Sequence, residues 1–156
     1  MGRVLHTLPD GKHAVWGVTS LDNLIYVLRV GKSEEQIEVY DKDSYKVQRC
    51  LTVPRLGYKS DMTACAHNCR AYISDWSNDC IHRVGLPHGT DVTNWPVNDK
   101  PFCISITDTH SALVTCGEVC KIKEFTTDGK LLRQIQLPQD FVSPWHTIQL
   151  SSVVSS

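Results

Sequence analysis

The strongest constraint on the fold is a β-rich unit that the sequence repeats three times. In the central unit, 71–84, apolar residues such as Tyr72 lead into a polar turn, after which Ile81 resumes an apolar pattern. Short polar side chains between two such runs are typical of a β-hairpin. The same strand, turn and strand recur at 112–125, and a copy with a longer loop lies at 24–40. Repetition at a period of about 40–45 residues predicts stacked modules, because one such unit cannot bury both of its faces.

Each unit contains four predicted strands, so the chain divides into consecutive sheets of similar length. After a lead-in at 1–13, the units occupy 14–56, 57–98 and 99–138. A fourth unit starts within 139–156, where a proline, an aromatic residue and an alternating strand follow one another as at the start of the third unit. We expect the serine-rich end of the chain to fray. The sequence therefore predicts an all-β protein with three four-stranded antiparallel sheets and the first strand of a fourth.

Charge and hydropathy count against several classes of function. The 156-residue chain carries 16 basic and 17 acidic side chains, for a net charge of −1, and no unit is a basic block. Sequence-independent binding of nucleic acid depends on clustered Lys and Arg, so the even balance argues against it. No stretch approaches the ~20 apolar residues of a membrane span, and no signal-peptide run follows the N-terminus. We expect a cytoplasmic protein without membrane association, in which several of the seven cysteines are small buried apolar side chains.

The hairpin motif resembles the NHL-type repeat, and more loosely the YWTD and TolB-like repeats. The matching residues are Tyr72-Ile73-Ser74-Asp75, Asn78 and Ile81 in the second unit, and Ile122, Phe125, Asp128-Gly129 and Lys130 in the third. The pattern is broken where Cys116 replaces the motif's Asp, and the first unit lacks that Asp as well. The tryptophan-aspartate repeat is the competing assignment, but its Gly-His and Trp-Asp signatures are absent in register. These repeats build β-propellers, commonly six-bladed, so the resemblance implies a partial propeller over about residues 14–150.

Candidates for metal binding and catalysis are few. A zinc interpretation rests on two cysteine pairs and three histidines: Cys65 and Cys69, Cys116 and Cys120, His67, His82 and His110. The spacing within each pair does not match a Cys-x-x-Cys knuckle, so we expect ordinary thiols and no metal. Asp75, Asn78 and Asp79 are interpreted as turn caps rather than calcium ligands. No hydrolase, metalloprotease or phosphate-loop motif is present, so the sequence predicts no catalytic residue and no cofactor, and favours a protein that is not an enzyme.

Residues for partner binding are expected in the loops that lead into each innermost strand, because in a propeller these loops gather on one face around the central channel. Trp76, in the turn of the central hairpin, is expected on the same face, since a tryptophan in a polar turn is hard to explain as core. The predicted partner-binding residues are Arg55, Tyr58, Lys59, Trp76, Lys100, Trp145 and His146.

Together these features predict a non-catalytic β-propeller binding module, a scaffold for protein–protein interaction that is a fragment of a larger propeller. The resemblance leaves two alternatives: part of a metal-dependent propeller lyase or esterase, and the RNA-binding NHL domain of a tripartite-motif ubiquitin ligase. An open arc of blades leaves an apolar sheet face exposed at each of its two ends, and soluble monomers seldom expose apolar faces as large as a whole blade. We therefore expect a protein partner, or a second copy of the chain, to complete the ring.

Overall fold

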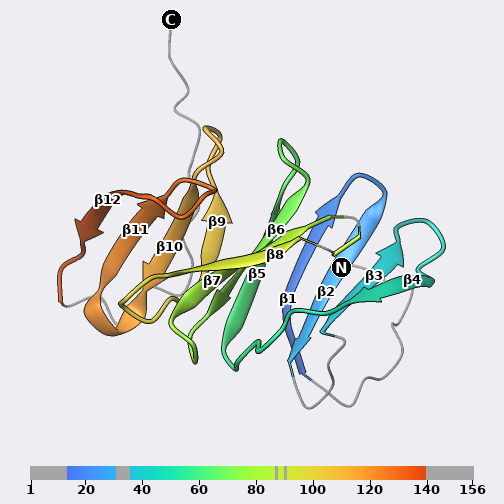
Figure 1. The fold of residues 1–156 in the computed structure, drawn as a ribbon, viewed down its shortest axis with the longest axis horizontal. Coiled ribbons are helices and arrows are strands. Elements are labelled where there is room, and N and C mark those ends of the chain that lie inside the picture. The colour runs from blue at the N-terminus through green and yellow to red at the C-terminus, as the bar shows by residue number, and fades with distance from the viewer. Residues whose placement is uncertain (1–13, 31–35, 87, 90, 140–156) are drawn as a thin grey trace, which may run out of the picture.

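Three four-stranded antiparallel sheets make up the protein (Figure 1). The computed structural model describes residues 14–30, 36–86, 88–89 and 91–139. Within each sheet the strands pair in the order of the sequence, so every sheet is a meander of consecutive hairpins. The three sheets are arranged as blades of a partial β-propeller, which confirms the predicted fold class.

The strands fall where alternating apolar residues and polar turns predict them. Blade A consists of β1 (Ala14–Leu21), β2 (Leu24–Val30), β3 (Ile37–Asp41) and β4 (Val47–Leu51). Blade B consists of β5 (Ser60–Cys65), β6 (Arg70–Asp75), β7 (Cys80–Gly85) and β8 (Val92–Pro96). Blade C consists of β9 (Ile104–Ile106), β10 (Ala112–Cys116), β11 (Lys121–Phe125) and β12 (Leu131–Gln136). The helical structure in the described ranges is one 3-10 turn, η1 (Gly117–Val119), and no helix there is long and apolar enough to cross a membrane.

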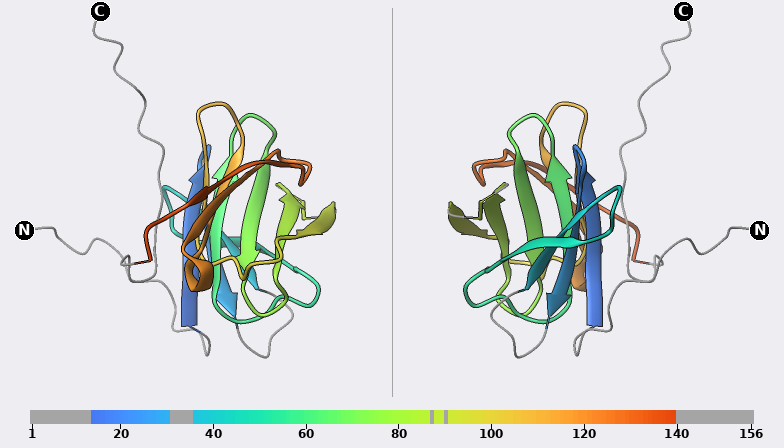
Figure 2. Two further views of the ribbon diagram at one scale, coloured as in Figure 1. Left: turned by 90° about the vertical axis from the view of Figure 1, so that its left-hand side faces the viewer. Right: turned by 90° about the vertical axis from the view of Figure 1, so that its right-hand side faces the viewer.

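Neighbouring blades meet along their innermost strands. Strand β5 lies against β1 on one side and against β9 on the other, and the views from the two ends of the molecule show the sheets one behind another (Figure 2). Gly17 of β1 packs directly against β5, where a Cβ atom at its position would lie 3.0 Å from the backbone N of Met62. A side chain at this position would require the two backbones to move apart by a few tenths of an ångström, so glycine suits the close packing of β1 against β5.

Two hydrophobic cores lie between the blades. The core between blades A and B contains Tyr26, Leu28, Ile37, Val39, Leu51, Val53, Met62, Ala71, Ile73, Val84 and Leu86. The core between blades B and C contains Cys65, Tyr72, Ile81, Trp95, Val97, Ile104, Ala112, Val114, Cys116 and Phe125. Blades A and C each contribute one face to a core and blade B contributes both of its faces. Stability therefore depends on the stacking of blades, as expected for a repeat protein.

The face of blade C that points away from blade B carries apolar residues at the same positions as the faces that form these cores, but these residues are more exposed to solvent. Ile37 in blade A and Ile81 in blade B are completely buried against the next blade, and strand pairing places Ile122 at the same position in blade C. Ile122 is only partly buried, and its cross-strand neighbour Ile135 is 46% exposed. Trp95, which pairs with Ile81 as Ile135 pairs with Ile122, is only 7% exposed.

Several predicted features fall outside the described residues. These are the lead-in at 1–13, the fourth-unit strand predicted at 144–150 and the C-terminal end. All seven cysteines are free thiols, and they divide by environment. Cys65, Cys80 and Cys116 are buried as predicted, whereas Cys50 and Cys69 are exposed.

Candidate functional site

Asp75 is the centre of the candidate site. It is the last residue of β6, its side chain is completely buried, and the turn between β6 and β7 begins directly after it. The carboxylate accepts four hydrogen bonds: from Gly57 N at 2.9 Å, Asn78 N at 3.1 Å, Asn78 Nδ2 at 2.8 Å and His82 Nε2 at 2.9 Å. Burial alone raises the pKa of Asp75, but these hydrogen bonds outweigh it and hold the pKa below its ordinary value. Asp75 is therefore an ionised turn cap, as the sequence predicts.

The turn after Asp75 also connects the loops that lead into β5 and β9. Ser77 Oγ accepts a hydrogen bond from Tyr58 N at 3.0 Å, and Asn78 Nδ2 donates to the carbonyl of Arg55 at 2.7 Å. On the other side, Asp79 Oδ1 accepts from the backbone N of Lys100 at 2.9 Å. One hairpin turn thus holds both entry loops at the same end of the molecule, where the sequence places the binding face.

Trp76 lies between the lysines of the two entry loops. The ammonium of Lys59 stands 4.2 Å from the centroid of the Trp76 ring, and that of Lys100 stands 5.1 Å from it. Lys100 Nζ also donates to the Trp76 carbonyl at 3.3 Å. Trp76 is partly exposed, Tyr58 is 63% exposed and Arg55 is exposed. We call these five residues, Arg55, Tyr58, Lys59, Trp76 and Lys100, the Trp76 patch.

Five of the seven predicted partner-binding residues therefore belong to one surface. Trp145 and His146 lie outside the described residues. The backbones of Lys59 and Lys100 share an unusual conformation, with φ angles of 55° and 51°. Residues with a Cβ atom adopt this left-handed region at a cost of roughly 1 kcal/mol, which glycine does not incur. A lysine at either position thus carries a small backbone cost, as does Arg55, whose φ angle is 61°.

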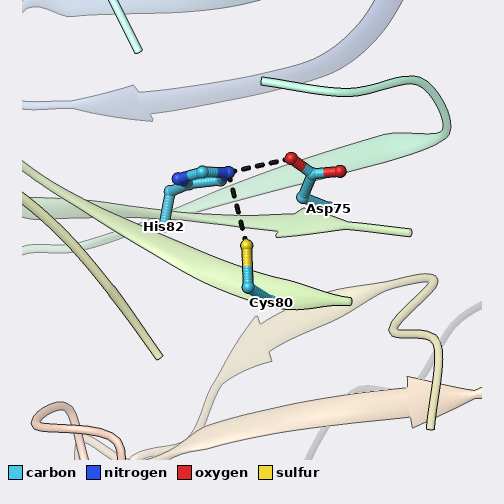
Figure 3. Close-up of side chains that lie close together, drawn as sticks. All are labelled: Asp75, Cys80 and His82. Carbon is cyan, nitrogen blue, oxygen red and sulfur yellow. Dashed lines mark hydrogen bonds and ion pairs between the residues drawn. The ribbon is translucent and has the colours of Figure 1, made fainter. Parts of the chain in front are cut away.

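A second group of side chains, Asp75, Cys80 and His82, lies beside the patch and was not predicted as a site (Figure 3). Cys80 is the cross-strand partner of Asp75, and His82 follows two residues later on the same face of β7. Nε2 of His82 lies 2.9 Å from Asp75 Oδ2 and 3.6 Å from Cys80 Sγ. All three residues are buried, and their three ligand atoms lie within 4.8 Å of one another. We call this group the Asp75 cluster.

A cleft of about 610 Å³ reaches the Asp75 cluster from the surface. Its lining residues are Pro54, Arg55, Asn78, Asp79, Cys80, His82, Asn94 and Pro96. Cys80 and His82 of the cluster thus line the cleft together with Arg55 of the Trp76 patch, although both cluster residues are almost completely buried. The sequence does contain a signal for this arrangement, because Cys80 and His82 alternate in the strand that follows the turn-capping Asp75. That signal becomes readable only when the register of the hairpin is known.

The Asp75 cluster does not have the geometry of a cysteine–histidine–aspartate catalytic relay. In such a relay the carboxylate and the nucleophile contact different ring nitrogens of the histidine. Here both contact Nε2, so the nitrogen that donates to Asp75 cannot also take the proton of Cys80. Burial, reinforced by the charges of Asp75 and Asp79, raises the pKa of the Cys80 thiol to about 12, so the reactive thiolate is scarce at neutral pH.

The cysteine pairs considered from the sequence do not form a comparable group. Among the residues that the structure describes, the Asp75 cluster is the set of three or more potential metal ligands that converge on one point. His67 and His110 do meet, at the tips of hairpins in adjacent blades, but their rings stack with centroids 4.0 Å apart and planes 7° apart. Stacked parallel rings direct their nitrogens outward in separate planes rather than toward a shared ion.

Comparison with known proteins supports the propeller fold. No family model and no curated protein sequence matches the chain. Among solved structures, virginiamycin B lyase from Staphylococcus aureus is similar with a TM-score of 0.68 and 21% sequence identity, covering 86% of this chain and 45% of the lyase. A catalytically inactive variant of that lyase with quinupristin gives a TM-score of 0.69 and 22% identity, covering 85% of this chain and 44% of the variant.

A protein with a different activity shares the same architecture. Hydrazine synthase from Kuenenia stuttgartiensis is similar with a TM-score of 0.64 and 16% identity, covering 87% of this chain and 40% of its own. At these identities the likeness concerns the fold alone, because one fold supports many activities. This chain spans less than half of the length of each of these proteins.

Proposed function

We propose that the chain is part of an NHL-type, six-bladed β-propeller and acts as a non-catalytic binding module for a protein partner. The observation that carries the proposal is the Trp76 patch, which presents an aromatic ring, two lysines and an exposed tyrosine on one face. Interfaces between proteins concentrate their binding energy in tryptophan, tyrosine and arginine, which the patch presents as Trp76, Tyr58 and Arg55. The two lysines, held in a backbone conformation that opposes them, give the patch a positive charge.

The charge of the patch favours an acidic partner segment that contains an aromatic residue. An acidic side chain can pair with Lys59, Lys100 or Arg55, while an aromatic side chain packs on Trp76 or Tyr58. Asp79 lies beside the patch, where its carboxylate accepts a hydrogen bond from the Lys100 backbone N, but the three cationic side chains of the patch outnumber its single negative charge. The proposal includes closure of the ring by a further set of blades, because blade C leaves Ile135 46% exposed at a position that other blades bury.

The test is binding of a fluorescent peptide of alternating glutamate and tyrosine to the full chain. We expect Trp76→Ala to weaken binding by about tenfold or more, as for an interface hot spot, and to leave the melting temperature within a few degrees. Trp16→Ala is the matched control, because Trp16 is 39% exposed on β1. Equal loss of affinity in both variants, or a collapse of stability in Trp76→Ala, contradicts the proposal.

Two further measurements on the full chain test the alternatives. Tighter binding of single-stranded RNA than of the peptide, with an affinity that falls steeply as salt increases, indicates phosphate contacts and the RNA-binding alternative. Metal-dependent turnover of a lactone or ester by the full chain indicates the lyase or esterase alternative. Metal-free Cys–His catalysis is not expected at the Asp75 cluster, because Asp75 and Cys80 contact the same nitrogen of His82.

A further inference from the structure

One internal position, formed by three neighbouring side chains, is occupied by different residues in the three blades. Strand pairing places Asp75, Cys80 and His82 of blade B in register with Cys116, Lys121 and Lys123 of blade C. In blade A the corresponding positions hold Arg29, Gln36 and Glu38. The position lies on the same side of each sheet, where the second strand ends and the third begins.

Blades A and C each place a positive side chain at this position. In blade A, Arg29 Nε donates to Glu38 Oε2 at 2.9 Å, and the Arg29 side chain is only 10% exposed. In blade C, Lys123 Nζ donates to Asp99 Oδ2 at 2.7 Å and to the Val97 carbonyl at 2.7 Å, with its side chain 7% exposed. A partly buried cation paired with a carboxylate is thus a shared feature of these two blades.

Blade B holds the carboxylate at this position but no lysine or arginine. Asp75 is completely buried, and the side chains closest to it across the hairpin are a thiol and an imidazole. We propose that Asp75, Cys80 and His82 bind a divalent transition metal ion of the zinc type, which takes the place of the cationic side chains in blades A and C. Carboxylate, thiolate and imidazole are all ligands that zinc accepts.

The distances fit such an ion with a small adjustment. Zinc bond lengths of about 2.0–2.3 Å to N, O and S place two ligand atoms of a tetrahedral site roughly 3.3–3.6 Å apart. The Cys80 Sγ to His82 Nε2 distance of 3.6 Å already fits, and the 2.9 Å between Nε2 and Asp75 Oδ2 must lengthen slightly. All three ligand atoms point toward one region, which suits an ion and, as shown above, does not suit a proton relay.

Binding of the ion involves two proton movements. The imidazole proton moves from Nε2 to Nδ1, which has no hydrogen-bond partner among the described residues, and the Cys80 thiol releases its proton to solvent. Asp75 exchanges the hydrogen bond from His82 for the metal and keeps those from Gly57 and Asn78. Because the cleft is lined by Cys80 and His82, the fourth coordination position opens toward it, and Arg55 on the same cleft favours an anionic fourth ligand.

The experiment uses the full chain after removal of metals with a chelator. Zinc is added by equilibrium dialysis, and cobalt is added separately because a cobalt–thiolate bond gives a charge-transfer absorption that reports the cysteine directly. We expect one ion per chain, with affinity about 100-fold lower or worse in His82→Gln and Cys80→Ser, since each removes a ligand. Cys116→Ser and His110→Gln are the controls, one a buried thiol and the other an exposed imidazole, and both should bind as the parent does.

A measurement on the parent protein guards against variants that do not fold. Zinc should slow the alkylation of Cys80 relative to that of Cys116, measured by mass spectrometry of the modified peptides. Absence of stoichiometric binding overturns the proposal, as does binding that survives both ligand substitutions. Unchanged alkylation of Cys80 in saturating zinc overturns it as well. If NMR shows that both ring nitrogens of His82 carry protons in saturating zinc, Nε2 cannot bind the ion and the proposal fails.

Discussion

Replacement of Asp75 by asparagine tests how much its buried carboxylate stabilises the turn that carries Trp76. The variant preserves the shape of the side chain but turns one of its two oxygens into an NH2 donor. The remaining oxygen can at best keep the three hydrogen bonds that Oδ2 now accepts, from Gly57, Asn78 Nδ2 and His82. The hydrogen bond from Asn78 N to Oδ1 is lost, because the new NH2 group and the Asn78 N–H are both donors and face each other in a part-buried place.

The expected loss of stability follows from this count. One bond to a charged acceptor is lost, a donor is left unsatisfied, and the other three bonds lose their charge assistance, which together cost about 2–4 kcal/mol. Urea denaturation in the presence of a chelator measures this loss without any contribution from metal. With a slope of about 2 kcal/mol per molar urea, the midpoint should fall by roughly 1–2 M. Asp91→Asn is the control, because Asp91 forms a half-exposed ion pair with Arg70 at 3.2 Å and its loss should cost under about 1 kcal/mol.

The pH dependence of the difference gives a second check. The pKa of Asp75 is lower in the folded protein than its ordinary value of 3.8, so the stabilisation is fully present above about pH 4 and is lost as pH falls through the folded pKa. The stability gap between the parent and the Asp75→Asn variant should therefore narrow only below about pH 4. A variant within about 0.5 kcal/mol of the parent at neutral pH would refute the reasoning, as would a gap that does not change in acid.

Two further predictions concern the contacts between blades. Gly17→Ala should lower the free energy of unfolding by about 1–3 kcal/mol in urea denaturation, because the new Cβ lies 3.0 Å from the backbone N of Met62 and pushes β5 away from β1. An unchanged midpoint would show that β1 and β5 are not fixed relative to each other. If the far face of blade C docks against further blades of a second copy, Ile135→Lys should shift the parent's associated species toward a 17.5 kDa monomer in size-exclusion chromatography with light scattering. Gln134→Lys, on the opposite face of the same strand, should leave association intact, and a monomeric parent contradicts this prediction.

The fold and the Trp76 patch could be predicted because both depend on local sequence. Alternating apolar residues and polar turns define each hairpin within a few residues, and the repeat then dictates how the hairpins stack. Trp76 was recognisable because a large aromatic residue in a polar turn has no place in a core. Its lysine neighbours were predicted from the position of their loops in a propeller.

The Asp75 cluster could not be predicted, because it depends on pairing across the hairpin. Cys80 and His82 look like ordinary strand residues until the register places them beside Asp75. A shift of one residue in the pairing would turn both side chains to the opposite face of the sheet. The difference in charge between the Asp75 cluster and its counterparts in blades A and C likewise emerges only when the three blades are compared strand by strand.

The meander order of the strands bears on how the chain folds. In each blade every strand pairs with the strand next to it in the sequence, and no described strand joins a sheet from a distant part of the chain. Such pairings close short loops, which cost little entropy, so hairpins can form early and blades can be added one after another. A nascent chain can therefore assemble blade A before blade C has been synthesised. The slow step should be the docking of one finished blade against the next, not the formation of the sheets themselves.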